Sequence, residues 1–251
     1  MEFPFPIFAV ISVLFFAVAF LYSSVGHGGA SGYLAVLSFF TLAPTLMSTT
    51  ALILNILVSG IALGTFLRAK HLEIKLTWPF IVSSIPAAFL GGTLQVSAYD
   101  YQFLLAAVLL VAGLRFLFES RPLGEESELK SPSLLVSLPV GASIGLVSGV
   151  VGVGGGIFLS PLILMMRWSD AKRTAATSAA FILSNSLAGL SGRVTEGSFA
   201  VGSLLPLLIV AFVGGLLGSH FGAVRYSQGT IRKLLGGVLL IASIKLFLAV
   251  L

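Results

Sequence analysis

The sequence has no cysteine and very little charge. Without cysteine among its 251 residues, the chain forms no disulfide, thiol nucleophile or cysteine-ligated metal site. Charged residues make up only 9%, whereas a soluble domain carries about a quarter. Apolar residues reach 57%, so there is too little charge to cover a surface that faces water. The composition therefore indicates that lipid is the solvent for most of the surface.

The few charges gather in short islands, and the apolar runs between them predict membrane-spanning helices. A helix crosses the hydrocarbon core with about 20 residues, and most of the runs approach that length. In lipid every backbone polar group must be paired inside the protein, which leaves helices or closed barrels. The runs are too continuously apolar for the alternating strands of a barrel. The sequence predicts an all-α integral membrane protein with about eight to ten membrane segments. The charge islands are 68–75, 119–130, 167–173, 193–196 and 225–233.

Glycines and prolines recur in the same order in the two halves of the chain, at an offset of about 126–130 residues. This recurrence predicts a duplication, with a first repeat at 1–118, a linker at 119–133 and a second repeat at 134–251. Each repeat offers five helical segments. The clearest matches are Gly26, Gly28 and Gly29 with Gly152, Gly154 and Gly155, Pro79 with Pro206, and Gly91 with Gly218. The expected segments are 7–25, 29–43, 46–67, 77–97 and 102–118, then 134–152, 154–166, 174–192, 199–222 and 232–251.

The basic loops follow different segments in the two halves. In the first half they join the third and fourth segments, and in the second half they follow the second and fourth. Because basic loops favour the cytoplasm, this pattern predicts inverted repeats, both termini outside and a cytoplasmic linker. The first two segments of each half are the shorter runs, so a re-entrant hairpin and two full crossings both stay open. Inverted repeats are typical of secondary transporters that hold substrate near the midplane.

Two glycine clusters, 26–30 and 152–156, predict broken or re-entrant helices. Clustered glycines favour left-handed backbone, and a break inside lipid frees N–H groups that need another partner. The helix after each break points its positive end at the gap, which predicts an anion site made without a buried lysine or arginine. Tight packing is the alternative, and it is our interpretation of the glycine runs at 141–149 and 214–222. Neither cluster continues as a nucleotide-binding P-loop.

The two clusters read Gly-His-Gly-Gly-Ala at 26–30 and Gly-Val-Gly-Gly-Gly-Ile-Phe-Leu-Ser-Pro at 152–161. With the duplicated helix set and the chain length, they resemble the sulfite exporter TauE/SafE family over nearly the whole chain. The resemblance implies a bacterial inner-membrane transporter of small sulfur-containing anions such as sulfite, sulfonates or thiosulfate. The first copy departs from three glycines at Ala30 and carries His27, so the half-sites differ and the substrate stays open. The family motif falls on Gly26, Gly28, Gly29, Gly152, Gly154, Gly155 and Gly156.

Polar side chains inside apolar runs complete the candidate site. Asn55 and Asn185 lie in the third segment of each half, where they serve either as donors to an anion or as ordinary interhelical bonds. His27 is either a proton relay or donor, or a structural histidine. No two histidines have metal-ligand spacing, and the sequence predicts no metal or cofactor. The substrate-binding candidates are Ser24, Gly26, His27, Gly28, Gly29, Ala30, Thr50, Asn55, Gly152, Gly154, Gly155, Gly156, Ile157, Ser178 and Asn185.

Together these features predict a secondary transporter, not an enzyme, in which a small anion binds between the repeats. An anion channel is the alternative, because both need a polar path through the bilayer. A second alternative rests on Gly189-Leu190-Ser191-Gly192, which resembles the motif of rhomboid intramembrane proteases, with His220 as the base. That motif does not account for the duplication. The partners are the anion and the bilayer, not nucleic acid, and a homo-oligomer stays open.

Overall fold

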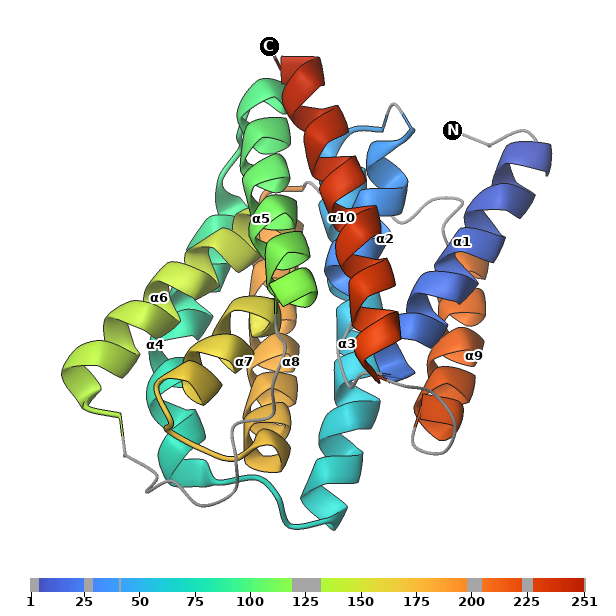
Figure 1. Cartoon of the computed structure of the whole chain (residues 1–251). Coiled ribbons are helices and arrows are strands. Elements are labelled where there is room, and N and C mark those ends of the chain that lie inside the picture. Colours follow the sequence, from blue (N-terminus) through green and yellow to red (C-terminus); the bar gives the residue numbers. More distant parts are fainter. Residues whose placement is uncertain are drawn as a thin grey trace. The chain divides into compact units, whose positions relative to one another are not determined.

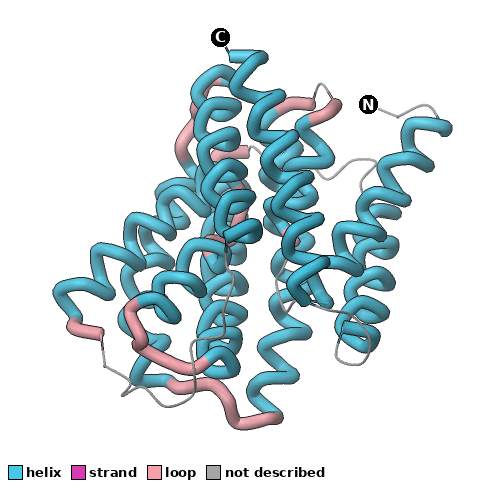
Figure 2. The backbone as a smooth tube through the Cα atoms, viewed as in Figure 1, coloured by secondary structure: helices cyan, strands magenta, loops and turns pink. Residues whose placement is uncertain are grey.

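The computed structural model describes residues 5–24, 29–40, 42–118, 132–197, 205–222 and 228–250. These residues form ten α-helices and no strand (Figure 2). The predicted all-α membrane fold is confirmed. Within the described ranges, five helices are long and apolar enough to cross a membrane, namely 6–23 within α1, and α3, α4, α5 and α6. Shorter apolar stretches lie at 156–165, 206–218 and 235–249.

Each of the ten predicted segments corresponds to one helix (Figure 1). The helices of the first half are α1 (Phe5–Ser24), α2 (Ala30–Ser38), α3 (Pro44–Arg68), α4 (Ile74–Thr93) and α5 (Ala98–Phe118). Those of the second half are α6 (Leu134–Val151), α7 (Gly156–Met165), α8 (Ala171–Thr195), α9 (Leu205–Gly222) and α10 (Gln228–Val250). Only α2 and α7, with 9 and 10 residues, are far too short to span a bilayer alone. The helices that precede them, α1 and α6, have 20 and 18 residues and are long enough to span it.

The helices divide into two compact units, and neither unit coincides with one half of the sequence. Unit 1 comprises Met1–Leu54, Val96–Ser120 and Phe199–Leu251, and unit 2 comprises Asn55–Gln95 and Arg121–Ser198. Unit 1 therefore holds α1, α2, α5, α9 and α10, and unit 2 holds α4, α6, α7 and α8. Helix α3 contributes its first part to unit 1 and its second part to unit 2. Each unit is thus assembled from both halves of the chain.

In unit 2, glycines let α4 and α6 approach along their backbones. A Cβ added at Gly141 would meet the carbonyl oxygen of Phe80 at 2.5 Å, and one at Gly145 would meet that of Ser84 at 2.5 Å. Each step of four residues along α6 matches a step of four along α4, so the two helices run parallel. Small residues four apart permit this close packing where apolar burial supplies no driving force. The packing interpretation of the 141–149 glycines is confirmed.

In unit 1, α1 and α9 form an equivalent parallel pair. A Cβ added at Gly214 would meet the carbonyl oxygen of Phe16 at 2.7 Å, and one at Gly218 would meet that of Phe20. The contact of Gly218 with Phe20 corresponds, at the offsets of the repeat, to a contact of Gly91 with the carbonyl oxygen of Leu146 in unit 2. The same backbone approach therefore recurs where the duplication predicts it.

Helices α5 and α10 lie side by side in unit 1 and run antiparallel (Figure 1). Gly113 approaches Gly236, whose carbonyl oxygen lies 3.1 Å from an added Cβ, and Ser243 Oγ donates to the Ala106 carbonyl at 2.8 Å. Residues later in α5 therefore contact residues earlier in α10. At a repeat offset of about 130 residues, Gly113 corresponds to Ser243 and Ala106 corresponds to Gly236. The two contacts are therefore equivalent to each other. Parallel α1 and α9, parallel α4 and α6, and antiparallel α5 and α10 are the directions expected of inverted repeats. The inverted repeat and its orientation in the membrane stay predictions.

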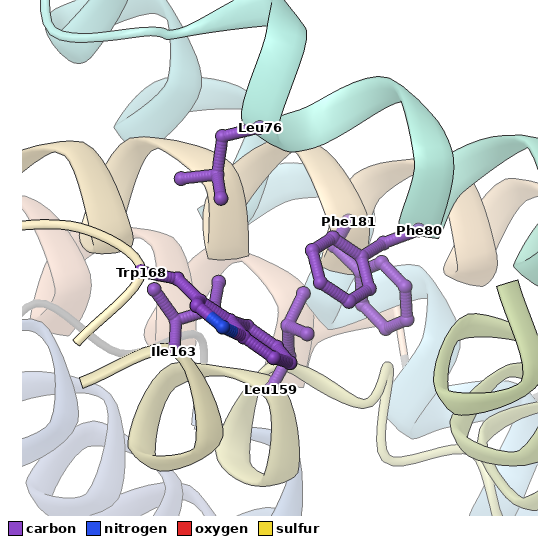
Figure 3. Packing of buried hydrophobic residues seen from close by; sticks show 6 residues of the cluster. All are labelled: Leu76, Phe80, Leu159, Ile163, Trp168 and Phe181. Carbon is purple, nitrogen blue, oxygen red and sulfur yellow. The ribbon is translucent and has the colours of Figure 1, made fainter. Parts of the chain in front are cut away.

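The basic loops before α4 and α8 meet at one end of unit 2. Arg173 Nη1 donates to Glu73 Oε2 at 3.1 Å, and one turn further along the hydroxyls of Thr77 and Thr177 lie 2.8 Å apart. The short helix α7 is held nearby by a cluster of buried apolar side chains (Figure 3). The cluster comprises Leu76, Phe80, Leu159, Ile163, Trp168 and Phe181. The end of α7 away from the glycine break is therefore anchored to α4 and α8.

Candidate functional site

The helix breaks at the second glycine cluster, as predicted. Helix α6 ends at Val151 and α7 begins at Gly156. Between them Gly152, Gly154 and Gly155 have φ values of 88°, 77° and 81°. These are left-handed conformations that side chains with a Cβ adopt only with strain. The four residues 152–155 are buried.

Several backbone amides at this break have no acceptor among the described residues. Gly152 N–H donates to the Ser148 carbonyl at 2.8 Å and closes the end of α6. The Gly155 carbonyl accepts from the amides of residues 158 and 159 and opens α7. Among the described residues, the N–H groups of Gly154, Gly155 and Gly156 donate to none. They lie at the positive end of α7, where free N–H groups and the helix dipole favour a negative partner.

Three buried polar side chains surround the same break. A Cβ added at Gly154 would lie 2.6 Å from Asn55 Nδ2 and 3.2 Å from Ser186 Oγ, and one at Gly155 would lie 2.5 Å from Ser148 Oγ. Asn55 is 1% exposed and the two serines are fully buried. None of their side-chain polar atoms has a hydrogen-bond partner among the described residues. Leaving a buried donor or acceptor unpaired costs about 1–3 kcal/mol for each group, so the site needs a further polar occupant.

Asn185 resembles these three side chains, whereas Ser178 does not. Asn185 is buried next to Ser186 on α8, and both of its amide atoms lack a partner among the described residues. Ser178 Oγ lies 2.7 Å from Ser160 Oγ, and Ser160 Oγ donates to the Gly156 carbonyl at 2.7 Å. Ser178 therefore links α8 to α7 through Ser160. Ile157 is buried in the first turn of α7.

The first glycine cluster lies partly outside the described residues. This holds for Gly26, His27 and Gly28, and for the side chain of Ser24. Gly29 has φ 85° and precedes α2, which begins at the buried Ala30. A Cβ added at Gly29 would lie 3.2 Å from Tyr33 Oη, a buried hydroxyl without a partner among the described residues. Thr50, also of unit 1, donates to the Leu46 carbonyl within its own helix at 2.7 Å. Unit 1 thus repeats a left-handed glycine before a short helix, with a tyrosine beside it.

Arg193 is a residue of this region that the sequence interpretation misplaced. We expected it in a loop after residue 192 and expected no buried arginine at the site. Helix α8 instead continues to Thr195, because Gly192 packs on the Phe89 carbonyl of α4 and keeps the last turn inside unit 2. Arg193 is 5% exposed, and its Nη2 donates to the carbonyls of Gly149 at 2.7 Å and Val150 at 2.8 Å. The glycines at 189 and 192 were the signal that this face stays packed.

Ser191, the nucleophile of the protease alternative, faces away from this site. It is exposed, and its Oγ donates to the Leu187 carbonyl of its own helix at 2.8 Å. The side chain of His220 lies outside the described residues. Among the described residues, Ser191 Oγ has no base as a hydrogen-bond partner.

Comparison with known proteins agrees with the resemblance in the sequence. The family described as Sulfite exporter TauE/SafE matches residues 11–246. The "probable membrane transporter protein y4hK" of Sinorhizobium fredii is 35% identical over 242 residues, covering 94% of this chain and 96% of that protein. The "probable membrane transporter protein YdhB" of Bacillus subtilis is 20% identical, covering 84% of this chain and 89% of that protein. No solved structure matches the chain significantly.

Proposed function

We propose that this chain, which belongs to the sulfite exporter TauE/SafE family, is a secondary transporter of small sulfur-containing anions. Membership of that family makes it a multi-pass membrane transporter and not an enzyme. The substrate class, the bacterial inner membrane and the outside position of both termini are parts of the proposal. Sulfite, organosulfonates and thiosulfate are the class that the family description suggests.

The observation that carries the proposal is the set of unpaired buried groups around the start of α7. Asn55, Ser148 and Ser186 offer one amide and two hydroxyls beside the N–H groups of Gly154 and Gly155, which have no acceptor among the described residues. An oxyanion with three or more oxygens accepts several such bonds at once, and these bonds replace its hydration shell. The positive end of α7 adds an electrostatic contribution without a full charge in contact with the ligand. Neutral donors suit a substrate that must also leave.

This site combines both halves of the sequence, as an anion bound between the repeats requires. Asn55 comes from the first half, and the glycines come from the second. We propose that Gly152, Gly154, Gly155, Gly156, Ile157, Ser178 and Asn185 line it together with Asn55, Ser148 and Ser186. Ser24, Gly26, His27, Gly28, Gly29, Ala30 and Thr50 are the candidates for the equivalent break in unit 1.

The proposed mechanism is alternating access between two inverted repeats. The parallel and antiparallel helix directions within each unit support the inversion, since a non-inverted duplication would reverse them. The sequence carries no ATP-binding motif, so the proposed energy source is an ion gradient or the gradient of the anion itself. A channel is the competing mechanism. Saturable, substrate-stimulated flux in proteoliposomes favours the carrier, and flux that rises linearly with concentration favours the channel.

Gly154→Ala tests the site, with Gly197→Ala as its matched control. Both glycines have positive φ, 77° and 66°, so alanine brings a comparable backbone strain of about 1 kcal/mol to each. Only the Cβ at Gly154 meets the polar cluster, because nothing lies within 4 Å of one at Gly197. We expect sulfite or thiosulfate to raise the melting temperature of wild type and Gly197→Ala more than chloride does, since a ligand that prefers the folded state stabilises it. Gly154→Ala should lose this shift.

Two results contradict the proposal. One is a wild-type protein that no sulfur oxyanion stabilises beyond chloride. The other is a Gly154→Ala variant that folds and keeps the full ligand-induced shift. Proteoliposome uptake of radiolabelled thiosulfate by the same three proteins provides the transport measurement.

A further inference from the structure

Arg193 holds the end of the helix that leads into the proposed anion site. Its guanidinium donates to the carbonyls of Gly149 and Val150, the last turn of α6 before Gly152. These carbonyls belong to the four that an α-helix leaves without intrahelical partners at its C-terminus. The contact is buried, so water does not screen it as it would at the surface.

The break between α6 and α7 brings two opposing helix ends together. The N-terminus of α7 carries a partial positive charge of roughly half a unit, which favours an anion. The C-terminus of α6 carries a partial negative charge of similar size, which disfavours one. Without compensation the two fields largely cancel for a ligand at the break. The guanidinium of Arg193 places positive charge on the carbonyls of α6, opposite in sign to this negative end.

We propose that Arg193 is an electrostatic positioning residue that makes this break attractive to anions by overcoming the negative end of α6. This inference rests on the proposed function, because it explains the charge preference of that same site. Arg193 acts through the carbonyls of Gly149 and Val150 and not through contact with the ligand. The positive field therefore lies behind neutral donors, so the anion is attracted without forming a tight ion pair.

The charge of the ligand provides the readout, because the electrostatic free energy scales with it. We compare methanesulfonate, with one negative charge, and thiosulfate, with two, binding to purified full-length protein in titration calorimetry. A unit charge about 10 Å away at an effective dielectric constant of about 20 changes the affinity for a monovalent ion about tenfold. Arg193→Gln should therefore weaken methanesulfonate about tenfold and thiosulfate about a hundredfold. Arg193→Lys keeps the charge and should retain most of the difference between the two ions.

Lys172→Gln is the matched control. It removes one positive charge from the exposed first turn of the same helix, and both affinities should stay within about twofold of wild type. Arg193→Met repeats the test with an apolar stem if the glutamine variant does not purify. A purely structural role predicts that the neutral variants lose both ions by the same factor, and that result overturns the inference.

Unchanged affinities in Arg193→Gln also overturn the inference while leaving the proposed anion site intact. A wild-type protein that binds neither ion overturns both. The two failures are therefore distinguished by the wild-type titration alone.

Discussion

Replacing Ser186 by alanine should make the empty protein more stable and its anion binding weaker. The hydroxyl of Ser186 is fully buried and has no partner among the described residues. Removing it relieves a desolvation cost of about 1–3 kcal/mol, and alanine adds about 0.5 kcal/mol of helix propensity. For a chain of this length, that corresponds to a rise in melting temperature of about 3–10 °C.

The affinity of the Ser186→Ala variant for the anion should change in the opposite direction to its stability. A hydrogen bond to a charged group contributes about 1.5–3 kcal/mol, so losing the Ser186 donor should weaken the oxyanion by about 10-fold or more. The ligand-induced rise in melting temperature should shrink accordingly, while the baseline rises. A residue that acts only in packing produces no such opposition between stability and affinity.

Ser191→Ala is the control on the same helix. Ser191 is exposed and already donates to the Leu187 carbonyl, so alanine there gains a similar propensity without emptying a buried site. The assay is thermal unfolding in detergent with and without thiosulfate, together with titration calorimetry. A Ser186→Ala protein that is less stable than Ser191→Ala when empty, or that binds thiosulfate as wild type does, refutes the reasoning.

Two further predictions concern packing and topology. Gly149→Ala should destabilise unit 2 by several kcal/mol, because its Cβ would meet the Ala88 carbonyl. The control Gly60→Ala in α3 meets nothing within 4 Å and should gain about 0.5–1 kcal/mol of stability. Unfolding by denaturing detergent measures both variants, and equal stabilities would contradict the α4–α6 contact. Single cysteines at Lys75 and Lys172 should react with an impermeant maleimide from the same side of the membrane, because the Glu73–Arg173 pair places both loops at one end of unit 2, and no native cysteine interferes. The predicted side is the cytoplasm, and labelling from opposite sides would contradict this packing.

The helices and the second break could be predicted because their signals are local. A run of apolar residues near spanning length forms a helix in lipid whatever surrounds it. Gly152, Gly154 and Gly155 break the helix because their own backbone conformations require it. The ends of α8 were less predictable. Its last turn stays helical because Gly192 and Arg193 find partners on α4 and α6, and those partners are far away in the sequence.

The polar side chains of the site could be predicted only in part. Asn55 stood out because an amide inside an apolar helix is costly in lipid. Ser148 and Ser186 did not, because serine is common in membrane helices and usually donates to its own backbone, as Ser160 does to the Gly156 carbonyl. That these two serines lack such a bond depends on packing, which brings them to Gly154 and Gly155 from α6 and α8. No periodicity within either helix contains that information.

The two glycine clusters of the predicted duplication have described surroundings of unequal chemistry. Backbone contacts such as Gly91 with Leu146 and Gly218 with Phe20 are retained in both units, because a glycine that admits a neighbouring helix tolerates no larger residue. Side chains beside the breaks are under no such restriction. In unit 2 an amide and two hydroxyls of three different helices surround the break, whereas the described donor beside Gly29 in unit 1 is the phenol of Tyr33. Several small donors adapt to a polyatomic anion better than one hydroxyl on a rigid ring, so unit 2 is where substitutions should alter substrate affinity most.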